Sequence, residues 1–174
     1  MNETPGIRVH LAIALLSAAL IALQLALMQL FALVQWHHYA WLVISIALLG
    51  FGASGSIFAL LRVRMLAIRP ILFPVLATLC AASIPLCTWA ALDSSAGFDP
   101  FLLFTEPARA WQLLLTCLLL FLPFVPGALI LVLAFAAWPQ RMGALYLSNL
   151  AGSGAGGLLA LILPWLFAPS AVPS

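Results

Sequence analysis

Charged side chains are scarce in this sequence of 174 residues: they make up 6% of it, against roughly 25% in an average soluble domain. Lysine is absent, so the six basic residues are all arginines, and with four acidic residues the formal net charge is +2. So small a balance does not favour binding to nucleic acid or to an acidic substrate. Cysteine is also rare, and the three that occur form no CxxC pair. We interpret them as small apolar packing residues.

Hydrophobic residues take the place of charges, at 66% of the chain and with a mean hydropathy of +1.24. They form uncharged runs long enough to cross a hydrocarbon core of about 30 Å, because a helix rises about 1.5 Å per residue. The first run is too long for the apolar core of a signal peptide, which has about 7 to 15 residues. We therefore predict an all-α protein, a polytopic transmembrane helix bundle in a single domain over residues 1–174, with no soluble domain. The five predicted spans are 11–34, 41–61, 71–92, 113–137 and 144–167.

The arginines predict an orientation, since cytoplasmic loops of membrane proteins retain positive charge. On one side of the predicted spans there are five arginines, whereas the other side has Arg109 together with Asp93, Asp99 and Glu106. That acidic loop is either a solvated loop or a weak attractant for a cation. We expect a cytoplasmic N-terminus and, after five spans, a C-terminus outside. The five arginines on the expected cytoplasmic side are Arg8, Arg62, Arg64, Arg69 and Arg141.

The stretch LLGFGASGS (48–56) has the G-x-G-x-x-G spacing of a dinucleotide-binding loop. That motif needs a strand before it and an acidic residue about 20 positions further on, but here a predicted span encloses the glycines and position 75 is valine. Lipid supplies no hydrophobic force between helices, which therefore associate through small residues that let their backbones approach. We interpret these glycines, and a similar series in the last span, as helix-packing residues, with close approach to a ligand as the alternative. The predicted packing residues are Gly50, Gly52, Gly55, Ser148, Gly152, Gly156 and Gly157.

The two glycine series also suggest an internal repeat. GFGASG (50–55) and GSGAGG (152–157) share glycine at their first, third and sixth positions, and the same offset carries the first predicted span onto the fourth. The chain would then hold an incomplete inverted three-helix repeat, whose second copy lacks its last helix. Inverted repeats recur in secondary transporters, with sites near the bilayer midplane between the copies. The alternative is that glycine-rich helices resemble one another through composition alone.

Four stretches, in this order, carry a family resemblance: VISIALLGFGASGSIFALL, FDPFLLFTEPARAWQLL, LPFVPGALIL and GALYLSNLAGSGAGGLLALI. They resemble the N-terminal membrane region of bacterial spermidine-synthase-like fusion proteins, over residues 25–165. In that family a membrane module precedes a cytoplasmic Rossmann-type domain related to aminopropyltransferases and methyltransferases. The resemblance implies a multi-pass protein of the bacterial inner membrane. It also implies a role as anchor or partner of a synthase-like soluble protein, together with passage of a small solute.

The sequence departs from that family in the part that would carry catalysis. Nothing in it corresponds to the soluble domain, so no catalytic residue is carried over, and we predict no enzyme activity and no cofactor for this chain. Asn149 occupies a place where the resemblance leads us to expect an acidic residue. With five spans, the chain would be a truncated product, a fragment or a stand-alone module. The alternative function is a stand-alone small-solute transporter built from the incomplete repeat and completed as a homo-oligomer.

Polar and helix-breaking residues inside the predicted spans point to a cavity. A polar side chain in lipid is costly without a partner, so such residues should face the bundle, either bonding to another helix or lining a polar path. Proline removes a backbone hydrogen bond and kinks a helix. In transporters broken helices expose backbone to the substrate, whereas a simple kink only improves packing. The predicted cavity or kink residues are Gln24, Gln29, Pro85, Pro123, Pro126 and Asn149.

His37 and His38 are flanked by Trp36, Tyr39 and Trp41 at the end of the first span. Helices that bind metals place histidines four positions apart, whereas adjacent histidines diverge by about 100°. We interpret the pair as part of an interfacial belt of amphipathic rings, with proton or metal chemistry as the alternative. The spans contain no metal-binding cluster and no nucleophile paired with a base, so we predict no metal site.

Overall fold

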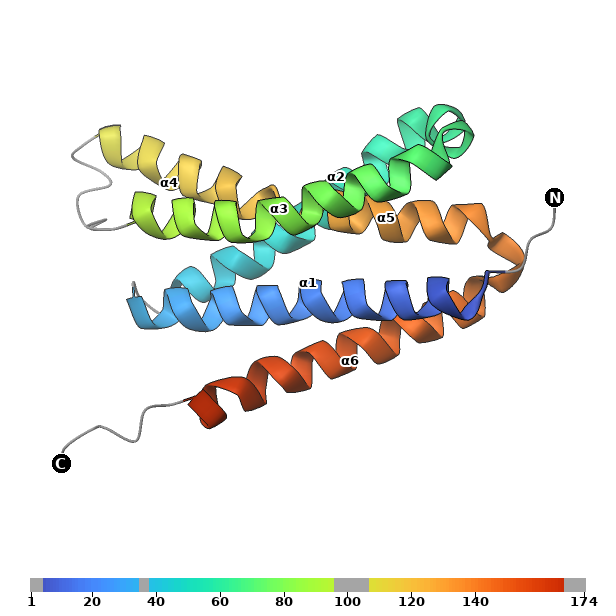
Figure 1. Cartoon of the computed structure of the whole chain (residues 1–174). Helices are drawn as coiled ribbons and strands as arrows, with labels where there is room; N and C mark the ends of the chain where they lie inside the picture. Colours follow the sequence, from blue (N-terminus) through green and yellow to red (C-terminus); the bar gives the residue numbers. More distant parts are fainter. Residues whose placement is uncertain (1–4, 35–37, 96–106, 168–174) are drawn as a thin grey trace.

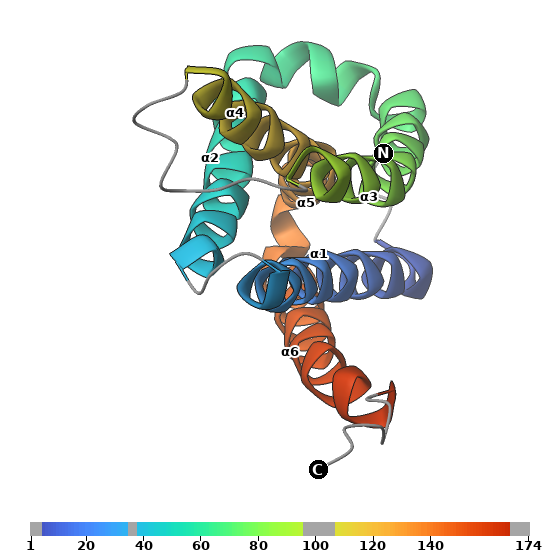
Figure 2. The same ribbon diagram turned by 90° about the vertical axis from the view of Figure 1, so that its left-hand side faces the viewer.

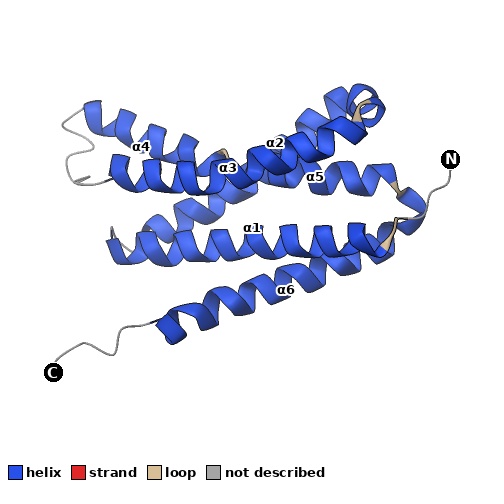
Figure 3. Cartoon of the chain, viewed as in Figure 1, coloured by secondary structure: helices blue, strands red, loops and turns tan. Residues whose placement is uncertain are grey.

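The computed structural model describes residues 5–34, 38–95 and 107–167. Every regular element in these ranges is a helix and no strand occurs in them, which confirms the all-α prediction (Figure 1, Figure 3). In chain order the elements are α1 (Ile7–Val34), α2 (His38–Ala67), α3 (Arg69–Ser95), α4 (Pro107–Phe121), α5 (Phe124–Ala137), the short 3-10 helix η2 (Pro139–Arg141) and α6 (Met142–Phe167).

Within the described ranges, five helical stretches are long and apolar enough to cross a membrane. They match the five predicted spans, and the fourth consists of α4 and α5 together. The chain therefore has the architecture of a multi-pass membrane protein. The stretches are Ile7–Phe31, Trp41–Ala67, Arg69–Ala91, Ala110–Ala137 and Pro139–Leu163.

The junction between the second and third spans is shorter than the sequence predicts. The expected end of the second span is residue 61, but α2 continues to Ala67 and α3 begins at Arg69. Arg62 and Arg64 therefore lie, exposed, on the last turns of α2 and not in a loop. Arginine is a good helix former, and its long side chain reaches water from the end of a span. The helix consequently does not stop at its first charge.

The two ends of the bundle differ in charge. At one end α1 begins, α2 joins α3 and α5 joins α6 (Figure 1), so the arginines in these segments gather there. Arg109 lies in the first turn of α4, which begins at the opposite end. By the positive-inside rule, this distribution supports the cytoplasmic placement of the arginine-rich end, which remains a prediction.

Thiol labelling tests that orientation. We expect Gln140→Cys, in a variant whose three native cysteines are replaced by alanine, to react with an impermeant thiol reagent only after the membrane is opened. Asp93→Cys should react in intact cells, because Asp93 and Gln140 are both exposed and lie at opposite ends of the bundle. The reverse pattern would invert the orientation, and labelling of both from one side would contradict the fold.

The closest helix pair is α1 with α6. A Cβ added to Gly152 would overlap the carbonyl group of Ala14 and lie 2.6 Å from its Cα, and one added to Gly156 would overlap the backbone of Ala18 in the same way. Backbone is therefore packed directly against backbone, as expected of small-residue interfaces in membranes. A Cβ on Gly157 would make ordinary contacts of 3.9 Å with Ile21 and Leu25. In the end view α6 lies beyond α1, on the side away from the other helices (Figure 2).

The second close pair is α2 with the fourth span. A Cβ on Gly50 would lie 2.7 Å from the Cβ of Phe124, and the Ser54 hydroxyl donates a 2.9 Å hydrogen bond to the carbonyl oxygen of Val125. The two glycine-rich helices thus pack at matching positions of their shared motif, α2 on the fourth span and α6 on the first. In an inverted repeat the second helix of each copy would pack in this way on the first helix of the other copy. The packing therefore supports the repeat as a proposal.

Gly52 and Gly55 are not at a helix contact in the described chain. A Cβ at either position would meet nothing within 4 Å. The reason is geometric: at about 100° per residue, Gly52 and Gly55 lie about 200° and 140° around α2 from Gly50. Contrary to the prediction, neither glycine packs against another helix within the described residues.

Candidate functional site

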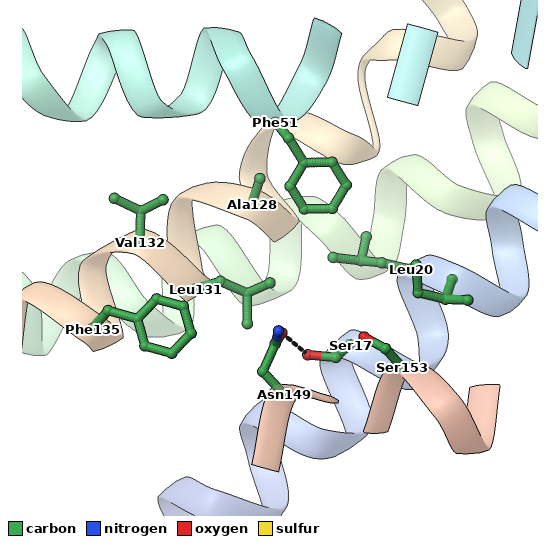
Figure 4. A pocket seen from close by; sticks show the side chains of 10 residues that line it. Ser17, Leu20, Phe51, Ala128, Leu131, Val132, Phe135, Asn149 and Ser153 are labelled. Carbon is green, nitrogen blue, oxygen red and sulfur yellow. Dashed lines mark hydrogen bonds between the residues drawn. The ribbon is translucent and has the colours of Figure 1, made fainter. Parts of the chain in front are cut away.

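A pocket of about 310 Å³ lies between α1, α2, α5 and α6, within the apolar spans (Figure 4). It lies between the α1–α6 pair and the remaining helices. Its wall is mostly apolar, with three polar side chains on the α1–α6 side. The lining residues are Ser17, Leu20, Ile21, Phe51, Ala128, Leu131, Val132, Phe135, Asn149 and Ser153.

The polar side of the pocket is a pair of hydrogen-bonded residues. The hydroxyl oxygen of Ser17 lies 2.6 Å from the Asn149 side-chain amide and 2.7 Å from the carbonyl oxygen of Ile13. Ser17 is buried, whereas Asn149 is half-buried and reaches the pocket. Ser153 lies one turn further along α6 and adds a second hydroxyl. These groups meet because Gly152 and Gly156 let α6 approach the backbone of α1.

The opposite side of the pocket is aromatic and aliphatic. Phe51 comes from α2, whereas Leu131 and Val132 come from one turn of α5 and Phe135 from the next. The Phe51 ring also lies 6.5 Å from the Phe124 ring, in a tilted arrangement that suits aromatic pairs. The pocket is thus amphipathic, with hydrogen-bonding groups facing a hydrocarbon wall (Figure 4).

A break in the fourth span lies one turn before the pocket. α4 ends at Phe121 and α5 begins at Phe124, because prolines at 123 and 126 lack the N–H groups that would continue the helix. Neighbouring helices supply hydrogen bonds to the carbonyls here: Ser54 to Val125 at 2.9 Å, and the thiol of Cys80 to Pro123 at 3.7 Å. Protein groups thereby satisfy irregular backbone that lipid could not.

The structure shows no break at Pro85, unlike at Pro123. Pro85 lies inside α3, which continues without interruption from Arg69 to Ser95, and it is exposed. Pro126 lies in the first turn of α5, where the missing N–H costs no intrahelical bond. Only the Pro123 position marks a break between helices in the described spans.

The glutamines of α1 differ from each other. Gln29 donates a 3.5 Å hydrogen bond to the Ala160 carbonyl oxygen of α6 and therefore connects the two helices. Gln24 is half-buried and makes no side-chain hydrogen bond to the described residues. It lies seven positions after Ser17, hence on the same stripe of α1.

At the arginine-rich end, His10 Nδ1 lies 2.9 Å from the hydroxyl oxygen of Ser148. Sequence reasoning missed His10, Ser17 and Ser54, which have hydrogen-bond partners on other helices. It also missed Ser153, which lines the pocket.

The histidine and acidic predictions are only partly within the described residues. His37, Asp99 and Glu106 lie outside them; His38 begins α2, but its side chain is not described. Among the residues that the structure describes, no group of three or more His, Cys, Asp or Glu side chains is placed to hold a metal. Three free thiols occur there, of which Cys80 and Cys87 are buried and Cys117 is partly buried.

Comparison with family models, with curated proteins and with solved structures found no match for this chain. The resemblance to spermidine-synthase-like membrane regions therefore remains a sequence-based proposal.

Proposed function

We propose that this chain is a membrane-embedded module that binds a small solute inside the bilayer and passes it through the helix bundle. The observation that carries the proposal is the amphipathic pocket, in which the Ser17–Asn149 pair faces open space within the apolar spans. Polar side chains at membrane depth are costly and commonly mark a solute pathway. An asparagine needed only to join two helices would not also have to line a pocket.

The arrangement of the helices supports passage as well as binding. α6 packs almost entirely on α1, whereas α3, α4 and α5 pack with α2 as a second group. The pocket lies between these two groups, with the Pro123 break beside it. In transporters, one helix group rocks against another around a site near the midplane. A small rotation of the α1–α6 pair would open or close the pocket without breaking the close contacts at Gly152 and Gly156.

A second role, as anchor or partner of a synthase-like soluble enzyme, is supported by the four ordered sequence motifs. This role is compatible with the first, because a membrane module that delivers a solute can also hold the enzyme that uses it. A reading frame for a Rossmann-type aminopropyltransferase-like domain beside the gene is the observation expected of this role. Its absence from several neighbourhoods would remove the support.

Cysteine accessibility tests the pocket. In the variant without native cysteines, we expect Ser153→Cys to react with a small water-soluble methanethiosulfonate reagent, because a pocket with polar groups admits water and water stabilises the reactive thiolate. Leu158→Cys is the matched control on the same helix: Leu158 is exposed on the surface of the bundle that faces lipid, where the thiol stays protonated. The measurement is the rate of modification in liposomes.

Equal rates at the two positions would contradict the proposal. If both cysteines are inert, no solute reaches the pocket; if both react, the α6 surface is not covered by lipid. A fast reaction at Ser153→Cys alone is the result expected of a solute site.

A further inference from the structure

We propose that the solute is an uncharged molecule with a compact apolar body and a hydrogen-bonding group that Asn149 and Ser153 bind. This inference rests on the proposed function and names the ligand class of the same pocket. Three observations carry it: the hydrogen-bonding capacity left open on α6, the lack of ionisable groups in the lining, and the hydrocarbon wall opposite.

The hydrogen bonds of Ser17 leave part of the Asn149 amide without a partner among the described residues. Ser17 has one hydroxyl hydrogen but lies within 2.7 Å of both the Ile13 carbonyl oxygen and the Asn149 amide. If Ser17 donates to Asn149, the two N–H hydrogens of that amide have no partner among the described residues. If Ser17 donates to Ile13, the amide turns its NH₂ group to Ser17, and within the described part of the chain its oxygen has no donor. In both cases part of the Asn149 amide is left for a ligand.

Ser153 extends the polar side by one helical turn. No hydrogen bond of its hydroxyl to the described residues occurs, although it lines the pocket beside Asn149. Free hydrogen-bonding groups in an apolar surrounding lower affinity for a molecule that cannot pair with them. They raise affinity for one that can. The pocket therefore selects for a hydroxyl, carbonyl or amide group on its ligand.

The lining of the pocket does not suit a charged ligand. None of the residues that line the pocket is ionisable. Moving a charged group out of water without a paired opposite charge is costly, and neither an amide nor a hydroxyl provides that charge. A polyamine, a metal ion or a phosphate consequently does not match this pocket, although the family resemblance implies polyamine chemistry nearby.

The volume and walls of the pocket limit the size and shape of the ligand. A volume of about 310 Å³ is at the low end of small-molecule pockets, which span about 300–1,000 Å³. Phe51 and Phe135 stand on the wall opposite Asn149, with Leu131 between them (Figure 4). The ligand body is thus a single ring or a short branched chain, with its polar group directed at α6.

Protection of a pocket cysteine tests the ligand class. The reporter is Val132→Cys in the variant without native cysteines, because Val132 lines the apolar wall and its replacement leaves the polar side unchanged. The probes are benzyl alcohol, toluene and benzylammonium, which share a ring and differ in the group attached to it. At about ten times its Kd, benzyl alcohol should slow modification about tenfold by occupying the pocket. Toluene and benzylammonium at the same free concentration should slow it less.

Asn149→Leu and Ser153→Ala in the same background test the polar side. Each should reduce the advantage of benzyl alcohol over toluene, and the modification rate without probe reports whether the pocket is still formed. Equal protection by toluene and benzyl alcohol would overturn the inference, as would stronger protection by benzylammonium or a pocket that holds water and no probe. In these cases the pocket remains reachable and the proposed function stands. An inert Val132→Cys without any probe would instead contradict the proposed function itself.

Discussion

Leucine in place of Gly152 or Gly156 should separate α6 from α1. At both positions the first added carbon would overlap backbone atoms of α1, at Ala14 and at Ala18. A flexible side chain could move aside, but a helix backbone cannot, so the whole α6 helix must shift. Overpacking a tight contact costs about 1–3 kcal/mol, and we expect the upper end of that range for each variant. The measurement is the free energy of unfolding in mixed micelles titrated with denaturing detergent.

Gly154→Leu is the control for this prediction. Gly154 lies on the same helix between the two glycines, and a Cβ there would meet nothing within 4 Å. The loss of helix flexibility and the gain in hydrophobicity are the same in all three variants, so only the contact with α1 differs. If Gly154→Leu is as damaging as Gly152→Leu, the α1–α6 interface is not the one described. Loss of the His10–Ser148 and Gln29–Ala160 hydrogen bonds should accompany the expected result.

The small-residue series could be recognised in the sequence, but the side of the helix in contact could not. Gly152 and Gly156 are four residues apart and face the same way, so a contact at one predicts a contact at the other. Gly50 and Gly52 belong to the same motif, yet among the helices that the structure describes Gly50 meets a neighbour and Gly52 does not. In a span that is apolar all round, periodicity contains no information about which face meets protein and which meets lipid.

The prolines show a similar limit. Pro85 and Pro123 both lie within long apolar runs, and the sequence predicts a kink or a cavity at each. Pro123 is followed by a second proline at 126, and Ser54 and Cys80 on other helices bond to the carbonyls of the break. Pro85 stands without another proline in its turn, and α3 continues through it. Whether a proline ends a helix depends on partners that sequence position does not reveal.

The pocket could be predicted only in part for the same reason. Asn149 was recognisable because a lone amide in an apolar span needs a partner. Its partner, Ser17, is an ordinary small residue in the sequence, since serine often bonds to its own helix, as Ser17 also does with Ile13. Phe51 and Phe135 resemble the other phenylalanines in the chain. Their place in the pocket follows from the rotation of α2 and α5, which the contacts at Gly50 and Phe124 determine.

Leucine in place of Gly50 is therefore expected to change both stability and the pocket. Its Cβ would lie 2.7 Å from the Cβ of Phe124 and 3.7 Å from the Phe121 carbonyl oxygen, at the two sides of the break between α4 and α5. Either α2 moves away or the first turn of α5 does, and Phe51, next to Gly50, moves with them. We expect a loss of about 1–3 kcal/mol in unfolding free energy, together with slower modification of Val132→Cys as the pocket collapses or is displaced.

Gly52→Leu provides the matched comparison, because a Cβ there would meet nothing within 4 Å and the substitution is otherwise identical. It should leave both the unfolding free energy and the Val132→Cys rate close to those of the parent. A large effect at Gly52 would mean that this face of α2 meets another helix in the membrane. An unchanged pocket in a destabilised Gly50→Leu protein would mean that Phe51 does not depend on the α2–α5 contact. The expected combination, with both properties altered only at Gly50, would show that the break at Pro123 and the pocket wall form one packed unit.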